Sequence, residues 1–349
     1  MRTFTLKGLF VTAIFMLLGC LAIHAADGDL ITKQITIKLE EAGTLPSKIG
    51  DTKKYKITNL KIMGEINGTD LRFIREMAGC DYNGKGTEGK LATLDLSEAK
   101  IVKGGDYYYN YYGCYTLDDV IGNQAFDGCS SLTSLTLPSS VTSIGSSAFS
   151  GCSGLTSLTL PSSVTKIGWY AFRGCSGLTN LSLPSSVTEI GWYAFDGCSG
   201  LTSLTLPSSV SSIGSFAFYG CSGLTSLTLP SSVSSIGESA FSGCSGLSSI
   251  YVNWESPLSI DASTFEDANT GKCILYVPKG TYDDYWISNW GIFENIVEYD
   301  PTGIDHITTS GEAKEISRYA ADGQRLEVPA KGLNIVKYSD GCVKKVVVQ

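Results

Sequence analysis

The stretch LTSLTLPSSVTKIGWYAFRGCSG, residues 155–177, is one of five consecutive copies of a 23-residue unit that together span residues 132–246. A partial copy, VIGNQAFDGCSS, precedes them at residues 120–131. A fixed period of this length is typical of a solenoid, in which each unit buries its apolar face only by stacking on its neighbours. The repeat therefore decides the fold.

Residues 155–177 divide into three parts. The opening LxxLxL predicts a short strand with Leu158 and Leu160 pointing inward, and Pro161 ends it because proline cannot donate to a sheet ladder. The segment VTKIGWYAF has apolar residues three to five positions apart, typical of one face of a helical or 3₁₀ turn: Val164, Ile167, Ala171 and Phe172. A glycine turn returns the chain, and coils are expected to stack at ~4.8 Å.

Weaker forms of the strand pattern lie on both sides of the array, at residues 57–62, 91–96, 247–252 and 275–278. The end units of a solenoid must cover an apolar face, so they are expected to depart from the regular repeat. The predicted fold class is an α/β-type solenoid of 23-residue leucine-rich repeats, each with a short strand and a short helical or 3₁₀ turn, followed by a small all-β C-terminal tail.

The chain divides into six segments by pattern and composition. They are a signal peptide (1–26), an N-terminal cap with irregular repeats (27–119), the regular repeats (120–254), a C-terminal irregular repeat and cap (255–300), a polar linker (301–314) and a small β tail (315–349). In the tail, LNIVKY and CVKKVVV flank a Ser-Asp-Gly turn, which predicts a β-hairpin.

The N-terminus reads MRTFTLKGLFVTAIFMLLGCLAIHAADGD, with a positively charged start, an apolar stretch and small residues at Ala25 and Ala26. This pattern predicts a secretion signal, too short for a membrane-spanning helix and cleaved near those alanines. In the alternative, LLGC makes Cys20 the lipidated first residue of a lipoprotein. We expect an exported protein, at the cell surface or outside the cell, on the outer side of a Gram-negative-type envelope.

Composition argues against two classes of function. A net charge of −8 provides no basic stripe for nucleic-acid phosphates. His24 and His306 are the two histidines, so the serines have almost no base to activate them for nucleophilic catalysis. We expect no enzyme activity, no cofactor and no metal site.

Six cysteines recur every 23 residues: Cys129, Cys152, Cys175, Cys198, Cys221 and Cys244. Neighbours one strand spacing apart are within disulfide reach. Yet thiols in register point in parallel, and a buried free cysteine behaves as a small hydrophobe. We expect reduced structural thiols, with occasional pairing as the alternative.

The loop GKGTEGK, residues 84–90, matches the bare GxGxxG pattern and nearly matches a phosphate loop. Both nucleotide-binding interpretations need a strand before the loop and a helix after it. Here a strand-like LATLDL follows. We expect a glycine-rich surface loop.

Residues 106–115, DYYYNYYGCY, contain six tyrosines and predict an aromatic loop between the irregular coils and the regular repeats. Either the rings pack over the open N-terminal end of the solenoid, or they form a contact patch, since tyrosine provides area and hydrogen bonds at low entropic cost. The candidate contact residues are Tyr107, Tyr108, Tyr109, Tyr111 and Tyr112.

Four positions vary from copy to copy while their neighbours stay fixed, and free positions are most simply outward positions. The middle copies therefore present an aromatic ladder with one arginine: Trp169, Tyr170, Arg173, Trp192, Tyr193, Phe216 and Tyr219. Exposed aromatic clusters often mark contact sites, although adjacent rings can simply cover one another. The strand side shows a nearly uncharged serine and threonine column that ends at Tyr251.

The repeat LTSLTLPSSVTSIGSSAFSGC, residues 132–152, resembles the BspA-like leucine-rich repeat of bacterial surface proteins, and residues 276–300 resemble the segment that often closes such arrays. The tail, with RYAADGQRL, KGLNIV and KKVVV, resembles the C-terminal sorting domain of a Bacteroidetes-type secretion system. The resemblance implies a cell-surface adhesion or host-interaction role and fixes no ligand.

The leading hypothesis is a non-catalytic surface adhesion protein that binds a host extracellular matrix protein or a glycan through the aromatic ladder. The alternative is a passive spacer or scaffold of the cell envelope with no specific ligand. A spacer would not respond to loss of the ladder, so a ladder variant separates the two hypotheses.

Overall fold

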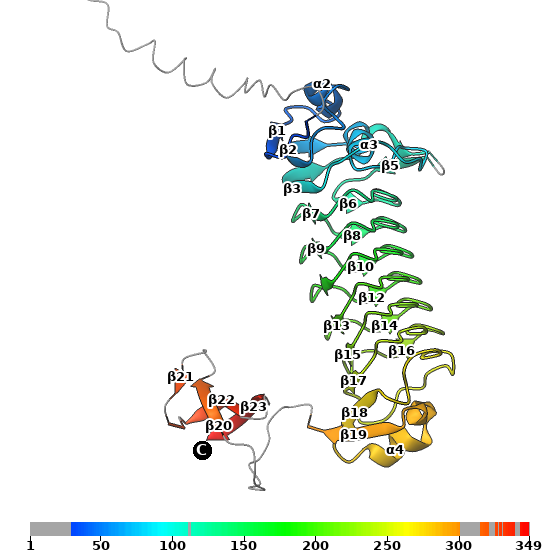
Figure 1. Ribbon diagram of the computed structural model, residues 1–349, viewed down its shortest axis with the longest axis vertical. Coiled ribbons are helices and arrows are strands. Elements are labelled where there is room, and N and C mark those ends of the chain that lie inside the picture. Colours follow the sequence, from blue (N-terminus) through cyan, green and yellow to red (C-terminus); the bar gives the residue numbers. More distant parts are fainter. Residues whose placement is uncertain are drawn as a thin grey trace, which may run out of the picture.

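The computed structural model describes residues 29–110, 113–300, 315–320, 325–326, 328–329, 331–338 and 343–348. Residues 29–110 and 113–300 wind into a solenoid whose coils stack along one axis (Figure 1). Within the described ranges, no helix is both long and apolar enough to cross a membrane. The predicted secretion signal and Cys20 lie outside these ranges.

One side of the solenoid is a parallel sheet made by the LxxLxL segments. Leu135, Leu158 and Leu181 pair in register, which confirms the predicted strand and the 23-residue stacking. The sheet is in two parts, with strand orders β1-β2-β3-β7-β9-β11 and β13-β15-β17-β18-β19. The strands are β1 (Ile35–Lys38), β2 (Asn59–Ile66), β3 (Thr93–Ile101), β7 (Ser134–Thr136), β9 (Ser157–Thr159), β11 (Asn180–Ser182), β13 (Ser203–Thr205), β15 (Ser226–Leu229), β17 (Ser249–Val252), β18 (Ile274–Pro278) and β19 (Asn295–Tyr299).

A second parallel sheet runs beside the first, with the order β16-β14-β12-β10-β8-β6. Its two-residue strands are β6 (Val120–Ile121), β8 (Ser143–Ile144), β10 (Lys166–Ile167), β12 (Glu189–Ile190), β14 (Ser212–Ile213) and β16 (Ser235–Ile236). These strands and the turns after them occupy the segment for which the spacing predicts a helical or 3₁₀ turn. That prediction is wrong, because the regular repeats contain no helix.

The backbone of the turn explains why no helix forms. Tyr170 and Gly174 have φ angles of 57° and 70°, in the left-handed region that a right-handed helix cannot include. The amides of residues 170, 172 and 174 donate to carbonyls of the next coil at 2.7 to 2.9 Å. The amides between them donate to carbonyls three residues back in their own coil. Alternate amides therefore join the coils and close the turn.

Identical side chains form columns inside the solenoid. Seven phenylalanine rings stack with centroids 5.1 to 5.4 Å apart: Phe126, Phe149, Phe172, Phe195, Phe218, Phe241 and Phe265. The six repeat cysteines are buried free thiols, as expected. Cys175, for example, donates from Sγ to the carbonyl of Phe149 at 3.1 Å. The fixed phenylalanine and cysteine positions of the repeat are therefore core positions.

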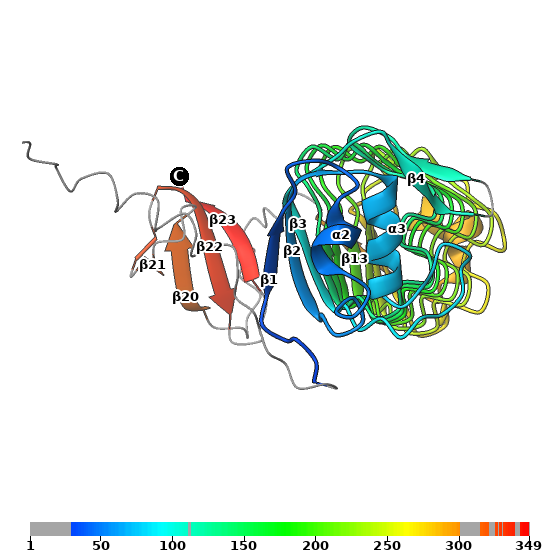
Figure 2. The ribbon, with the colours of Figure 1, turned by 90° about the horizontal axis from the view of Figure 1, so that it is seen from above.

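Two helices, α2 (Leu45–Ile49) and α3 (Gly68–Met77), lie across the N-terminal end of the coil stack (Figure 2). Asn67 caps α3 through the amide of Thr69, and Asp70 completes a capping box by accepting from the amide of Asn67. The carboxylate of Asp70 also accepts from the amide of Leu45 at 2.9 Å, which ties α2 to α3.

Arg75 of α3 completes the hydrogen bonds of the first coil. In the regular coils, three carbonyls of each turn accept hydrogen bonds from amides of the preceding coil. In the first coil, residues 120–131, the equivalent carbonyls belong to residues 123, 125 and 127, and no regular coil precedes them. Arg75, which is fully buried, donates to the carbonyls of Ala125 at 3.1 Å and Asp127 at 3.0 Å. The hydroxyl of Tyr108 donates to the carbonyl of Asn123 at 2.8 Å. The cap thus replaces a missing coil.

Aromatic side chains close the C-terminal end around α4 (Tyr282–Ile287) and the 3₁₀ helix η1 (Asn289–Ile292). Phe265, the last ring of the core column, meets Trp290 at 5.5 Å and Phe293 at 5.2 Å. Trp290 is fully buried and donates from Nε1 to the carbonyl of Leu258 at 2.7 Å. This end is therefore sealed by apolar packing.

The tail forms a separate antiparallel sheet in the order β21-β20-β22-β23. Its strands are β20 (Glu315–Ala320), β21 (Arg325–Leu326), β22 (Gly332–Tyr338) and β23 (Val343–Val348). β22 and β23 pair antiparallel from Gly332 opposite Val348 to Lys337 opposite Val343, which confirms the predicted hairpin. The likeness of this tail to a sorting domain remains a prediction.

Replacing Arg75 by leucine tests the cap. Arg75→Leu leaves buried carbonyls of the first coil without donors, so the free energy of unfolding is expected to fall by about 3 kcal/mol or more. Arg72→Leu is the matched control, because Arg72 lies on the same helix and stacks on Tyr82 at 3.5 Å; its expected cost is about 1 kcal/mol or less.

Urea unfolding followed by circular dichroism measures both losses, and amide hydrogen exchange locates them. Exchange in Arg75→Leu should accelerate first in the coil of residues 120–131. Equal losses in the two variants would contradict a capping role for Arg75.

Candidate binding surface

A corner follows each strand of the second sheet (Figure 1). The residues of the aromatic ladder follow β10, β12 and β14 in the sequence and therefore belong to three of these corners. Gly168 begins one such corner against the preceding coil, where a Cβ would lie only 2.6 Å from the carbonyl carbon of Gly145. Trp169 and Tyr170 then lie outside the core. The left-handed backbone of Tyr170 turns the chain so that Phe172 re-enters the core.

The ladder consists of two parallel ring stacks. Trp169 and Trp192 have centroids 5.4 Å apart and planes 14° apart, and each is 54% exposed. Beside them, Tyr170 stacks on Tyr193 at 4.8 Å, and Tyr193 stacks on Phe216 at 4.6 Å. These three rings are half-buried. The tryptophans are therefore the rings most available to a ligand.

Charged side chains flank the stacks in pairs that cross from one coil to the next. Arg173 donates from Nε to the carboxylate of Asp196 at 3.0 Å, and Lys166 lies 3.7 Å from Glu189. Burial raises the pKa of Asp196, and Arg173 partly offsets that shift. Tyr219 extends the second stack, tilted by 60°, and is 43% exposed. The structure thus brings all seven ladder residues of the sequence analysis to one surface.

The strand side presents the expected serine and threonine column, whose members are Thr136, Thr159, Ser182, Thr205 and Thr228. Tyr251 follows them in register and stacks on Tyr276 at 4.4 Å, while Tyr299 meets Tyr251 edge-on at 5.6 Å. Sequence reasoning did not include Tyr276 and Tyr299 in this face. The regular strand pattern of residues 275–278 was the signal that could have found Tyr276.

The tyrosine segment is a β-hairpin of β4 (Gly104–Tyr109) and β5 (Cys114–Thr116), packed beside α3. Tyr108 is only 1% exposed and serves the cap, which corrects its place among the contact candidates. Tyr109 is half-buried near the guanidinium of Arg75, 4.8 Å from its ring centre. Tyr107 is half-buried between Tyr82 and Tyr115, at 5.9 and 6.3 Å.

Tyr111 and Tyr112 lie outside the described residues. β4 lies beside α3 at the N-terminal end of the stack (Figure 2), and its Tyr108 donates to the carbonyl of Asn123 in the first coil. Burial of Tyr108 favours the interpretation that the tyrosine rings pack against the N-terminal end of the solenoid over the interpretation that they form a contact patch.

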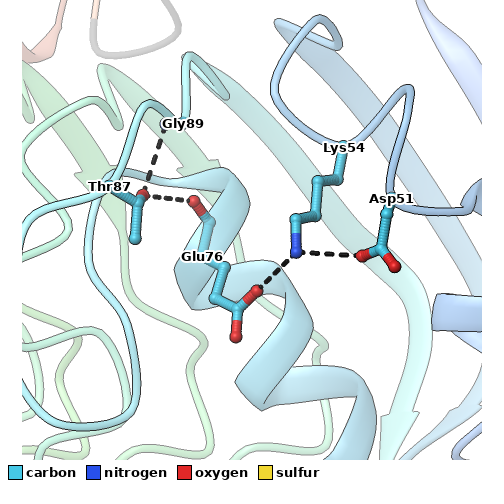
Figure 3. Close-up of polar contacts among 5 residues, drawn as sticks. All are labelled: Asp51, Lys54, Glu76, Thr87 and Gly89. Atoms are coloured by element: carbon cyan, nitrogen blue, oxygen red, sulfur yellow. Dashed lines mark hydrogen bonds and ion pairs between the residues drawn. The ribbon is translucent and has the colours of Figure 1, made fainter.

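The glycine-rich loop is tied to the C-terminal end of α3 (Figure 3). The hydroxyl of Thr87 donates to the carbonyl of Glu76 at 2.6 Å and accepts from the amide of Gly89. A Cβ on Gly89 would lie 2.3 Å from the same carbonyl oxygen, so only glycine fits there. The strand β3 follows the loop, as the sequence predicts, and the glycines serve close packing.

Lys54 lies in a groove beside that loop, between α2 and α3 (Figure 3). It pairs with Glu76 at 2.9 Å and with Asp51 at 3.0 Å. Partial burial lowers the pKa of Lys54, but the two carboxylates outweigh burial and raise it. The groove is lined by both acidic and basic side chains, so charges of one sign do not gather at one point. In the part of the chain that the structure describes, no three His, Cys, Asp or Glu side chains are arranged to hold a metal ion.

A second apolar surface, which sequence reasoning missed, lies on α4. Tyr282 and Trp286 stack on its outer face, and Trp286 and Ile287 are 51% and 80% exposed. The spacing of Tyr282 and Trp286 by four positions was the available signal, since such residues share one helix face.

The family described as BspA type Leucine rich repeat region matches residues 119–248 and 165–281, with six copies. The repeat array is a BspA-type leucine-rich repeat region. The resemblance stated from the sequence is therefore confirmed for the BspA-type repeats.

Several solved structures are similar to this chain. A leucine-rich repeat protein of T. pallidum is 28% identical over 53% of this chain and 71% of its own, with a TM-score of 0.34. The pneumococcal vaccine antigen PcpA is 19% identical over 72% and 82%, with a TM-score of 0.37. A leucine-rich cell surface protein from Faecalibacterium prausnitzii is 22% identical over 76% and 87%, with a TM-score of 0.30. Comparison with curated proteins gives no match.

The buried thiols of the BspA-type repeats predict a loss of stability in alkali. Burial raises the pKa of Cys175 from its ordinary 9.0 to about 12. The folded protein therefore keeps a proton that the unfolded chain releases, so this stabilisation is complete below pH 9 and is lost as the pH rises towards 12.

Between those limits the loss is about 1.4 kcal/mol per pH unit for each such thiol. Urea unfolding of the protein and of Cys175→Ala at several pH values measures it, since the variant should lose stability less steeply. Identical slopes for the two proteins would show that Cys175 does not titrate in this way.

Proposed function

We propose that this protein is an exported, non-catalytic binding protein of the cell surface, and that its aromatic ladder contacts a host extracellular protein or a glycan. One observation carries the proposal: Trp169 and Trp192 are each more than half exposed in a position where other copies hold serine or glutamate. The fold does not need these rings. Large exposed aromatic patches on soluble proteins often mark interaction sites.

The contact positions have the properties of an interaction centre. Two stacked tryptophans present a rigid area that loses little side-chain entropy on binding. Arg173, with 60% of its side chain exposed, lies 5.7 Å from the ring centre of the neighbouring Tyr170 and is held by Asp196. Tryptophan, tyrosine and arginine are the residues that most often dominate binding energy at protein interfaces.

The N-terminal sequence supports export, and the repeat family supports a binding or scaffold role. Anchoring by lipid at Cys20, delivery by a sorting tail and free secretion are three ways to reach the surface. A non-catalytic role is supported by the ladder itself, which combines rings and paired charges but no nucleophile with an adjacent base.

A passive spacer is the second candidate, and the strand side favours it. The column from Thr136 to Thr228 is uniform, uncharged and repeated in every coil. A long rod of stacked coils with such a face would hold two components of the cell envelope apart without recognising a ligand. In that case the ladder rings only cover one another.

A ladder variant distinguishes the candidates. Trp169, Tyr170, Trp192 and Tyr193 are all changed to serine, which already occupies both columns in other copies with the same left-handed backbone, as at Ser147 and Ser239. The variant should therefore fold. Binding to immobilised matrix proteins and to a glycan panel is compared with that of the unchanged protein, and we expect the variant to lose at least about tenfold in affinity.

A matched control removes aromatic area elsewhere: Trp286→Ser on α4 should bind like the unchanged protein. Binding that the ladder variant retains would move the contact to the strand side or the tyrosine hairpin. No binding by the unchanged protein would favour the spacer.

A further inference from the structure

The two aromatic stacks begin on the same coil. Trp169 and Tyr170 are the first rings, and the matching positions of the preceding coil are Ser146 and Ser147. Because stacked partners are 23 residues apart, the ring normals point roughly along the solenoid axis. Each inner ring face is therefore covered by its neighbour, and bare faces occur only where a stack begins or ends.

The two ends of the tryptophan stack differ. At the C-terminal end, Trp192 leans over Gly214 of the next coil, where an added Cβ would lie 2.6 Å from Cδ1 of the indole. At the N-terminal end, the preceding coil places only the small side chains of Ser146 and Ser147 beside the first rings. The open aromatic face is therefore the N-terminal face of Trp169, with Tyr170 beside it.

We propose that this step in the surface, formed by Ser146, Ser147, Trp169 and Tyr170 and here called the serine shelf, binds one pyranose ring of a neutral glycan. A ring stacked on Trp169 at the 5.4 Å spacing of the tryptophan pair would lie over the two serines, one coil away. The shelf thus has room for one flat ring in place of the side chains that later coils supply.

The chemistry around the shelf selects the sugar. A pyranose has a flat face of C–H groups and a rim of hydroxyls that both donate and accept. The shelf matches these with an indole face and with serine hydroxyls, which also donate and accept. Arg173, whose guanidinium carbon lies 5.7 Å from the ring centre of Tyr170 and whose side chain is 60% exposed, adds N–H donors beside that ring. An aromatic side chain of a protein partner would use the indole face but leave the hydroxyls without partners.

Charge favours a neutral sugar. Arg173 is paired with Asp196, and Lys166 is paired with Glu189, so the neighbourhood has no unbalanced positive charge. The net charge of the chain, −8, disfavours a polyanion. This inference rests on the proposed function, since it assigns one ligand class to one end of the aromatic ladder.

The chain itself suggests the variant that closes the shelf. Changing Ser146 to Trp and Ser147 to Tyr gives this coil the two residues that the next coil has at the same positions, so the backbone needs no change. The control Ser215→Trp lengthens the same stack at its other end and leaves the shelf open. A third variant, Trp169→Ser with Trp192→Ser, deletes the stack and tests the proposal even if the filled shelf folds poorly.

The full chain and the three variants are titrated with neutral oligosaccharides of glucose, mannose, galactose and N-acetylglucosamine. Calorimetry gives the affinity, and the indole N–H signals in NMR spectra show which tryptophan responds. We expect at least one sugar to bind with a shift of the Trp169 signal. The filled variant (Ser146→Trp with Ser147→Tyr) and the stackless variant (Trp169→Ser with Trp192→Ser) should weaken the binding of this sugar at least about tenfold. Ser215→Trp should leave its affinity unchanged.

Two results would overturn the serine shelf: no neutral oligosaccharide binds, or the filled and stackless variants bind as well as the unchanged protein. If a matrix protein binds through the ladder while no sugar does, the proposed function stands and this inference fails. If neither binds, both fail together.

Discussion

The hydrogen bonds between successive coils are the constraint on which this structure depends. On the turn side, alternate amides donate to carbonyls of the next coil, and on the strand side residues 23 positions apart pair in register. Both sets of hydrogen bonds require that successive coils have the same length. They also leave the carbonyls of the first coil without donors, and that is why Arg75, a fully buried arginine, belongs to the cap. The N-terminal helix is thus part of the same hydrogen-bond system as the repeats.

The fixed register places every repeated side chain directly beside its copies. Inside, this produces the phenylalanine and cysteine columns, whose members are buried because the neighbouring coils cover them. Outside, the same register stacks whatever the free positions contain. Trp169 and Trp192 lie face to face because two consecutive copies carry the same substitution. The aromatic ladder is therefore a product of the fold and of a local choice of side chains.

The sequence predicts what depends on the period and on local polarity. The strands follow from the leucine alternation, and the ladder follows from variation between copies. The helical turn was wrong because the spacing of Ile167, Ala171 and Phe172 also suits a strand followed by a tight turn. The left-handed φ of Tyr170 decides between them, and tyrosine gives no sign of it. The role of Arg75 could not be predicted, since its carbonyl partners in the first coil lie 49 to 52 residues away.

The outward corner separates the fold from recognition. Ser147, Tyr170, Tyr193, Phe216 and Ser239 have φ angles between 50° and 58°, so the backbone is the same whether the side chain is a hydroxyl or an aromatic ring. The amides at this corner, not its side chains, join the coils. Side chains here can therefore change coil by coil without disturbing the core. The place of a bare aromatic face is then set by the coil at which serine gives way to tryptophan, and in this chain that step lies between Ser146 and Trp169.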